Sequence, residues 1–418
     1  MLVVVASSAG AAYAQDAIVE GKGVKVGEGT VVRPILGIET GWVSNLYYDD
    51  TDQTQVAALR LMAAFSTGSA GEERTKVEAP EGDQDKVSQG EPPSVKWALG
   101  AKLRYTEYPF SSQRAEMQRN LGADANLDLV IKPQGTFRVE LSDKFARDTN
   151  PTNFESRFQV NRDVNELKTG LVYQPGGRAI TAGLHYQNRI DYFESSDQSF
   201  ASRIQHQVLL SADWQWLPIT KFSFEGSYGI YLPLDNSSWK QESSPISGRI
   251  GIASAITEKT FGRASLGWAY AGYSFGEGYN TPVGDLEFGY RYSPTGKFSI
   301  AYSYDFNDSI NANFFRDHAV LFKLDQQINR WVFDGIFDVR LRGYRGVPPQ
   351  LMASSPNRDD FVMGVLARLR YLYRDRLSFS GTWRSTVDQT NFRYTAGPGV
   401  DNPSYDRHEF MLGATAAF

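Results

Sequence analysis

Cysteine is absent from this chain, and so is any long apolar run. Without cysteine, the 418 residues can form no disulfide, no thiolate metal site and no lipid-bearing cysteine behind a signal peptide. No run of about eighteen apolar residues follows the N-terminus, and the mean hydropathy is -0.39, which excludes a helical membrane protein. The net charge of -5 is small for this length and argues against a nucleic-acid partner.

Glycine and aromatic side chains are plentiful instead. The chain has 38 glycines, and 13% of its residues are aromatic, which is typical of a sheet protein with many tight turns. A chain of this length could form two or three soluble domains or one large barrel. The spacing of its turns and the period of its strands decide between these.

The N-terminus resembles the end of a signal peptide. An apolar run at 2–5 is followed by the small-x-small cleavage pattern of Ala12, Tyr13 and Ala14. We therefore expect residues 1–14 to be a signal-peptide remnant and residues 15–30 to be a periplasmic N-terminal segment. The alternative is a short buried strand. No basic residue precedes the apolar run, so we expect the true start of translation to lie further upstream.

Short and long connections alternate from about residue 31 to the C-terminus. The short turns lie at 133–135, 175–178, 217–218, 257–259, 293–296, 327–329 and 374–375. The longer polar loops lie near 47–54, 107–122, 146–155, 192–201, 232–245, 274–282, 305–316, 343–358 and 389–403. This alternation is typical of barrels with tight periplasmic turns and long external loops, and it predicts about eighteen strands. An even number of strands places both termini in the periplasm.

Two segments need a separate interpretation. Residues 67–94 are rich in Glu, Gly, Pro and Lys, and their place in the alternation predicts a long periplasmic connection. Residues 156–174 could form one long strand or two short ones, because the apolar parity changes between Val160 and Leu167. We predict one strand with a bulge, since two strands would break the alternation of connections.

Individual segments alternate strictly between apolar and polar residues. In 298–304 and 286–292 the even positions are apolar or aromatic, and the run that ends the chain at Phe418 behaves in the same way. These runs reach about ten residues, the length that crosses a bilayer at a tilt, whereas strands of soluble sandwiches are shorter. Aromatic residues near strand ends, among them Trp331 and Tyr373, suit interfacial girdles.

These patterns predict an all-β fold: a transmembrane, antiparallel, up-and-down β-barrel over residues 31–418. We expect it in the outer membrane of a Gram-negative bacterium, where outer-membrane lipid and lipopolysaccharide would contact its exterior. The terminal Phe418 resembles the signature read by the barrel assembly machinery, which we expect as a further partner.

Charged residues are expected on the inner face, because a charge facing lipid costs about 2–4 kcal/mol at the bilayer midplane. Parity places Arg189, Asp191, Arg203 and Arg249 inside. The densest inward group combines arginines on three consecutive strands with two aspartates, and its members are Arg340, Arg342, Arg368, Arg370, Arg384, Asp334 and Asp338.

This group has two interpretations. The five arginines could form a basic ladder along one wall, facing the substrate path and binding anionic groups through forked hydrogen bonds. Alternatively, they pair with Asp334, Asp338 and Asp388 and hold the wall rigid, and this interpretation is favoured.

No catalytic, cofactor or metal site is predicted. Of the four histidines, parity turns His206 and His318 toward lipid, and no histidine pair or carboxylate cluster has a metal-binding spacing. Asp406 and His408 lie two residues apart, as in barrel proteases, but the opposing acidic pair cannot be placed. We therefore expect that the protein is not an enzyme and has no cofactor.

The segment from Val32 to Tyr47 resembles the opening of β-barrel porin family 2, with a proline in the first strand and Asn45 at its outer end. The strand at 102–105 and the turn at 132–135 are similar to that family as well. Ser44 departs from the family pattern, which has an aspartate before the asparagine. Members often accompany exopolysaccharide synthesis and export systems.

The resemblance implies an outer-membrane conduit for exopolysaccharide secretion. Its partners would be the polysaccharide polymer as cargo and a periplasmic polysaccharide export protein. Two alternatives remain open: a general or anion-selective diffusion porin for small solutes, and a structural or adhesive barrel. A diffusion porin would have an inward-folded constriction loop and opposed rows of charge, whereas side chains and loops would close the lumen of an adhesive barrel.

Overall fold

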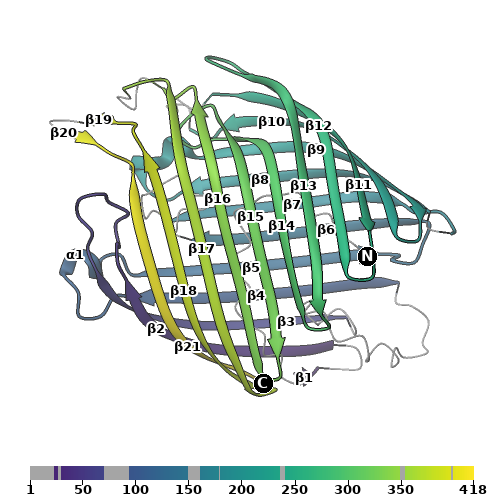
Figure 1. Ribbon diagram of the computed structural model, residues 1–418, viewed down its shortest axis with the longest axis horizontal. Coiled ribbons are helices and arrows are strands. Elements are labelled where there is room, and N and C mark those ends of the chain that lie inside the picture. Colours follow the sequence, from purple (N-terminus) through teal and green to yellow (C-terminus); the bar gives the residue numbers. More distant parts are fainter. Residues whose placement is uncertain are drawn as a thin grey trace.

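Long antiparallel strands form a single closed barrel in the computed structural model (Figure 1). The structure describes residues 23–26, 30–69, 94–148, 161–177, 179–235, 241–348, 354–396 and 399–418. The eighteen long strands are β2 (Thr30–Val43), β3 (Val56–Ser69), β4 (Val95–Glu107), β5 (Asn120–Ile131), β6 (Phe137–Asp148), β7 (Arg162–Tyr173), β8 (Ile180–Phe193), β9 (Arg203–Leu217), β10 (Thr220–Pro233), β11 (Ser243–Ala255), β12 (Thr260–Tyr273), β13 (Tyr279–Ser293), β14 (Gly296–Asp308), β15 (Phe314–Ile328), β16 (Trp331–Arg345), β17 (Asn357–Arg374), β18 (Leu377–Thr390) and β21 (Tyr405–Ala417). The predicted all-β barrel and its strand number are confirmed.

The barrel closes where the first and last long strands meet. β2 pairs with β21 in an antiparallel register that runs from Ile35 opposite Ala417 to Val43 opposite Glu409. Every other long strand pairs with its neighbours in chain order, which is the up-and-down topology. The two-residue strand β1 (Val24–Lys25) adds to the start of β2, within residues 15–30, which were expected to form a periplasmic N-terminal segment.

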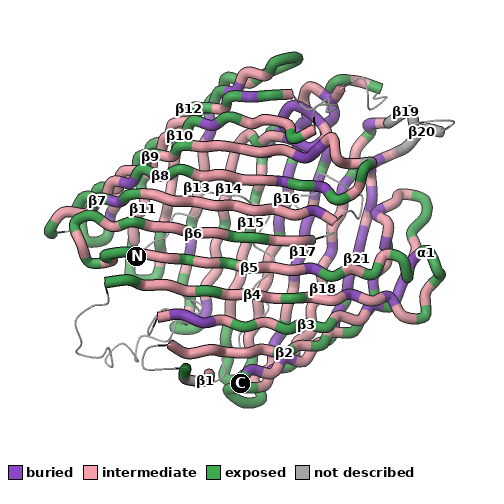
Figure 2. Tube along the Cα trace, turned by 180° about the vertical axis from the view of Figure 1, so that it is seen from behind, coloured by how far each residue is buried: buried purple, intermediate pink, exposed green. Residues whose placement is uncertain are grey.

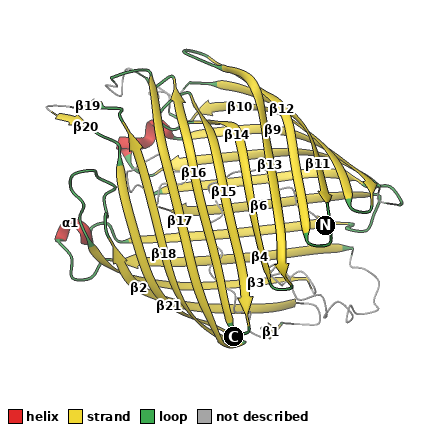
Figure 3. Ribbon diagram, in the orientation of Figure 1, coloured by secondary structure: helices red, strands yellow, loops and turns green. Residues whose placement is uncertain are grey.

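The connections alternate in length as the sequence predicts. All the short turns lie at one end, which we call the short-turn end, and the longer loops lie at the other, the long-loop end. The long-loop end also carries the helix α1 (Gln113–Glu116), the 3-10 helix η3 (Ser196–Ala201) and a small hairpin of β19 (Tyr394–Ala396) and β20 (Gly399–Asp401) (Figure 3). In the part of the chain described here, no helix is long and apolar enough to span a membrane.

Three expectations concern segments that lie wholly or partly outside the described residues. The signal-peptide remnant at 1–14 and most of the segment at 15–30 cannot be compared with the structure. Of the connection predicted at 67–94, residues 70–93 are not described. What the structure shows is that this segment joins β3 to β4 at the short-turn end.

The bulge predicted within 156–174 is wrong for the described part of that segment. β7 is one strand, and from Arg162 onward its register with β6 and β8 is unbroken. The parity change has a different cause: Val164 and Val172 are apolar residues on the inner face, and Val172 is only 3% exposed. Apolar side chains therefore lie on both faces of this strand, with Leu171 48% exposed on the outer one.

The exterior of the barrel is apolar over a broad belt. Leu36, Ile38, Phe410 and Leu412 are all about half exposed and lie on one face of the closing strand pair, whereas inward Glu409 is 6% exposed. Trp331 and Tyr373, expected as girdle residues, are also exposed, and so are Trp214 and Trp216 near the end of β9. A closed sheet with an apolar outside is the outer-membrane type of barrel.

Buried residues gather toward the end that bears α1, β19 and β20 (Figure 2). One apolar cluster there joins the β2–β3 loop to the loop that contains α1, with Leu46 and Ala115 fully buried. The side chain of Ser112 caps α1, since its Oγ accepts a hydrogen bond from the amide of Ala115 at 3.3 Å. The long loops are thus packed onto the barrel.

Closure between β2 and β21 depends on a residue without a side chain, Gly41. A Cβ at Gly41 would lie 1.9 Å from the carbonyl oxygen of Phe410 and 2.8 Å from Cα of Met411, both backbone atoms. We expect Gly41→Ala to lower the free energy of unfolding by about 1–3 kcal/mol, because the strands must separate locally. Urea titration and the mobility difference between heated and unheated samples on a detergent gel measure this.

Gly37 on the same face provides the control. A Cβ there would meet Cε of Met62 at 2.7 Å, the far end of a flexible side chain that can move. Gly37→Ala should therefore cost much less than Gly41→Ala. Equal stability of the two variants would contradict the role assigned to the closing seam.

Candidate functional site

The tip of the β14–β15 hairpin bends away from the wall into the lumen. β14 pairs with β13 only as far as Tyr304, whereas its pairing with β15 continues to Asp308 opposite Phe314. Residues 305–315 therefore form a hairpin tip attached to the wall only on its β16 side. We call this segment the constriction hairpin.

Aromatic contacts show on which side of the wall the constriction hairpin lies. Tyr273 and Tyr279 belong to the inner faces of β12 and β13, because they alternate with outward residues. The ring centroid of Tyr279 lies 4.8 Å from that of Phe306 and 5.0 Å from that of Phe314, and Tyr273 lies 6.0 Å from Phe314. The hairpin residues thus pack against the inside of the neighbouring wall.

Two ion pairs hold the constriction hairpin in this position. Asp308 pairs with Arg203 on β9, and Asp305 accepts a hydrogen bond from Nη2 of Arg249 on β11 at 2.7 Å. Four strands separate β9 from β14 in the sheet order, so the Arg203–Asp308 contact spans the interior rather than linking neighbours. The long-loop mouth is narrowed by this segment.

Apolar contacts extend the constriction hairpin toward both sides of the mouth. Ile310 is 6% exposed and packs with Phe193 and Ala201 around the β8–β9 loop. Ala312 is fully buried in a second cluster that contains Tyr344 and Phe392, which come from β16 and the β18–β21 loop. The hairpin tip therefore connects loops from distant parts of the barrel.

Asp191 anchors the wall that faces the constriction hairpin. Its carboxylate is 1% exposed and lies 2.8 Å from Nη2 of Arg162, 3.1 Å from Nε of Arg203 and 3.5 Å from Nη2 of Arg189. A buried carboxylate is tolerated only when charges and hydrogen bonds compensate its lost hydration. Arg203 therefore bridges two acids, Asp191 in the wall and Asp308 in the hairpin.

The loop between β8 and β9 is fixed by a charged contact at its start. Nε and Nη2 of Arg147 donate to the two carboxylate oxygens of Glu194 at 2.7 and 3.0 Å, and Asn161 donates to the same carboxylate. The hydrogen bonds from Arg147 lower the pKa of Glu194 below its ordinary value. This loop carries η3, which contributes the buried Ala201 to the constriction.

The structure places Arg340 and Arg342 on the inner face of β16, toward the long-loop end. Nη2 of Arg340 lies 2.5 Å from Oδ2 of Asp338, and its Nη1 lies 3.6 Å from Asp317. Nε and Nη2 of Arg342 donate to the two oxygens of Asp317, each at 2.7 Å, which is a forked pair. Arg342 is also 4.1 Å from the ring centroid of Phe315, which places it under the constriction hairpin.

Arg368 and Arg370 lie nearer the short-turn end and share one carboxylate. Nε of Arg368 is 3.2 Å and Nη2 of Arg370 is 2.5 Å from Oδ2 of Asp334 on β16. Arg384 lies opposite Glu409 in the register of β18 and β21. The predicted group is therefore split into separate clusters along the wall.

The favoured alternative, pairing with aspartates, describes these contacts better than a continuous ladder does. Asp334 and Asp338 pair with arginines as that interpretation requires. Asp388 lies 3.6 Å from Arg358, an arginine outside the predicted group.

Sequence reasoning missed several charged residues of this wall and the constriction hairpin itself. Asp317, Arg358 and Asp360 are less than 6% exposed and complete the ion pairs around Arg342. Asp308 was hidden inside the loop predicted at 305–316. The one signal in that loop is its aromatic content, with Phe306, Phe314 and Phe315 in a segment otherwise treated as solvated.

The described residues give no support for other chemistry. Nε2 of His408 lies 3.9 Å from Oδ2 of Asp406, and both side chains are over 40% exposed. Within the described ranges, no group of three or more His, Asp or Glu side chains could hold a metal ion.

Solved structures similar in fold include outer-membrane proteins of Pseudomonas aeruginosa. OccK2 (OpdF) is 8% identical with a TM-score of 0.47 over 93% of this chain and 98% of that one. OccK11 (OpdR) is 12% identical with a TM-score of 0.45 over 94% and 98%. The siderophore receptor PirA is 9% identical with a TM-score of 0.42 over 93% and 80%.

No protein-family model and no curated protein sequence matches the chain. The resemblance to β-barrel porin family 2 thus stays a prediction. At these identities the similar structures describe only the shape of the barrel, so the function is argued below from this chain's own contacts.

A substitution of Asp334 tests whether the charged cluster that it forms with Arg368 and Arg370 affects ion selectivity. Asp334→Asn would leave Arg368 and Arg370 without the carboxylate they share, so the local potential becomes more positive. We expect the reversal potential in a salt gradient across a planar bilayer to shift toward anion selectivity.

Glu258→Gln is the matched control, since it removes one negative charge in the short turn between β11 and β12. It should leave the reversal potential unchanged. If Asp334→Asn behaves like the control, the Arg368–Asp334–Arg370 cluster does not face the conducting path.

Proposed function

We propose that this protein is an outer-membrane porin for the passive diffusion of small hydrophilic solutes, with a mouth narrowed by the constriction hairpin. The supporting observation is the Arg203–Asp308 pair, which fastens the hairpin tip to the far wall. A barrel of this strand number is wide enough for an aqueous channel, and an inward segment limits the size of what passes. This was one of the alternatives left open by the sequence.

The chemistry of the wall suits polar solutes of either sign. Arginines and aspartates are interleaved on the inner faces of β15 to β18, and each arginine cluster contains an acid within hydrogen-bond distance. The same is true of β21 and β3, where Nη1 of Arg60 lies 2.7 Å from Oε1 of Glu409. We therefore expect weak ion selectivity rather than a strong preference for anions.

Secretion of an exopolysaccharide, which the family resemblance implied, is less well supported by this geometry. A polymer needs a continuous path, whereas the constriction hairpin connects β9 to the β16 side of the mouth. The predicted periplasmic export partner would contact the short-turn end, where residues 70–93 are not described. An adhesive barrel remains the third possibility, and conductance separates it from a porin.

The constriction can be removed without touching the wall. In a variant in which Gly-Gly replaces residues 309–313, the tip loses Ile310 and Ala312 and with them its apolar contacts on both sides. We expect the single-channel conductance in planar bilayers, and the largest sugar that enters liposomes, to increase. Arg203→Ala should act in the same direction because it releases Asp308.

Lys221→Ala is the control for Arg203→Ala. Lys221 also forms a pair across β9 and β10, with Nζ 3.1 Å from Asp213, but near the short-turn end. It should leave conductance unchanged. A wild-type protein that does not conduct, and still does not after the deletion, would contradict the porin and favour an adhesive barrel. Loss of secreted polysaccharide when the gene is deleted would instead restore the secretion hypothesis.

A further inference from the structure

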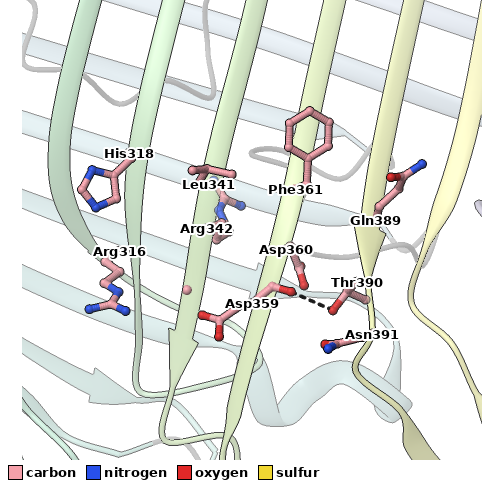
Figure 4. Close-up of a pocket in the computed structure, with 11 residues that line it drawn as sticks. Arg316, His318, Leu341, Arg342, Asp359, Asp360, Phe361, Gln389, Thr390 and Asn391 are labelled. Carbon is pink, nitrogen blue, oxygen red and sulfur yellow. Dashed lines mark hydrogen bonds between the residues drawn. The ribbon is translucent and has the colours of Figure 1, made fainter.

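A hollow lies on the outside of the barrel, across β15, β16, β17 and β18 at the long-loop end (Figure 4). Its volume is about 660 Å³. Two rows of residues on the outer face line it. The first row is continuous in the strand register, and so is the second from Arg316 to Asp359, with Asn391 just beyond the end of β18. The first row consists of His318, Leu341, Phe361 and Gln389, and the second of Arg316, Gly343, Asp359 and Asn391.

The hollow lies at the edge of the apolar belt, as the neighbouring row of outward residues shows. The outward row nearer the barrel centre consists of Val320, Val339, Met363 and Val387. Moving toward the long-loop end, the exterior thus changes from aliphatic to mixed and then to charged within three rows. Such a gradient marks the boundary between acyl chains and headgroups.

Aromatic residues beside the hollow support this boundary. The hydroxyl of Tyr302 lies 2.9 Å from Nδ1 of His318, and the Tyr304 ring is stacked on the same histidine at 4.3 Å. Tyrosine side chains with an apolar ring and a polar tip are enriched at the level of lipid headgroups. His318 therefore sits in the interfacial girdle and not in a lumen site.

Position 343, which lines the hollow, has no side chain. A Cβ at Gly343 would lie 2.9 Å from Oδ1 of Asp359, 3.0 Å from Nε of Arg316 and 3.2 Å from Nη1 of Arg345. Two guanidinium groups and one carboxylate converge on this point. Because position 343 is a glycine, these charged groups can lie close to the backbone of β16.

The group formed by Arg316, Arg345 and Asp359 carries a net positive charge. Nη1 of Arg345 donates to Oδ1 of Asp359 at 2.9 Å, so these two charges compensate each other. Arg316 is exposed, and the described structure contains no hydrogen bond or ion pair from its side chain. Its guanidinium is thus available to an anion, with a planar arrangement of donors suited to a phosphate.

We propose that this hollow binds the phosphorylated glucosamine headgroup of lipopolysaccharide. Arg316 would donate to a phosphate oxygen, while Leu341 and Phe361 contact the beginning of the acyl chains. Three observations favour this ligand over a free anion: the interfacial position, the exposed apolar side chains of Leu341 and Phe361 in the first row, and a volume far greater than one phosphate needs. The long-loop end, expected to face outward, is the side on which lipopolysaccharide is found.

The test uses the full-length barrel in a non-ionic detergent, titrated with purified rough lipopolysaccharide and followed by native mass spectrometry. Arg316→Glu should weaken binding about tenfold or more, because it replaces a charge-assisted hydrogen bond by repulsion. Gly343→Val should also weaken binding, because its side chain fills the hollow. Clashes there involve the flexible ends of side chains, so the barrel should still fold.

Arg374→Glu is the matched control. Arg374 is another exposed arginine beside an aromatic ring, with its guanidinium 5.3 Å from the centroid of Tyr373, but it lies at the short-turn end. It should bind lipopolysaccharide as the unmodified protein does. Single-channel conductance should be equal in all these variants, so failure here is distinguishable from failure of the porin proposal.

Unchanged lipopolysaccharide affinity in Arg316→Glu would overturn the proposal. So would equal affinity for phosphatidylglycerol in a parallel titration, since the site would then recognise any anionic lipid. Displacement of lipopolysaccharide by millimolar inorganic phosphate would show that the hollow is a simple anion site, which also contradicts the assignment.

Discussion

Every feature of this protein depends on the requirement that a sheet inside a bilayer has no free edge. In hydrocarbon no water can pair with an unpaired amide, so a membrane-spanning sheet has to close on itself. Here the closure is the pairing of β2 with β21, and Gly41 allows the two backbones to approach at the seam. The alternation of side chains between lipid and lumen follows directly from that closed geometry, because each strand has one face on either side.

Closure also concentrates charges inside. The lipid face excludes them, so the wall must accept arginines and carboxylates at short distances, and each pays a desolvation cost unless it is compensated. Asp191, with three arginines around it, and Asp334, shared by two, are products of that constraint. In the described strands, the clusters around Asp191, Asp317 and Asp334 consequently combine arginines with carboxylates. A basic ladder inferred from parity alone leaves out the carboxylates that pair with these arginines.

The apolar/polar alternation and the turn residues predict those features of the fold that depend on residues close together in the sequence. The strand number, the order of short and long connections, and the exposure of Phe410 and Leu412 all follow from a period of two punctuated by Gly, Pro, Asn and Asp. The inward bend of residues 305–315 does not, since it depends on Tyr279 and Arg203, which are distant in sequence. β7 shows the opposite error: the parity change between Val160 and Leu167 predicts a bulge, but inward Val164 and outward Leu167 belong to one strand whose register is unbroken from Arg162 onward.

In β15, side chains that contact the constriction alternate with side chains that line the outer hollow. In β15, Phe315 and Asp317 point inward to Arg342 and the constriction, whereas Arg316 between them points outward to the hollow. Adjacent β16 repeats this order, with Leu341 and Gly343 outside and Arg342 inside. Because a strand separates successive side chains by the thickness of the sheet, a change on one face leaves the contacts of the other intact. Channel width and lipid binding can therefore be altered independently at neighbouring positions.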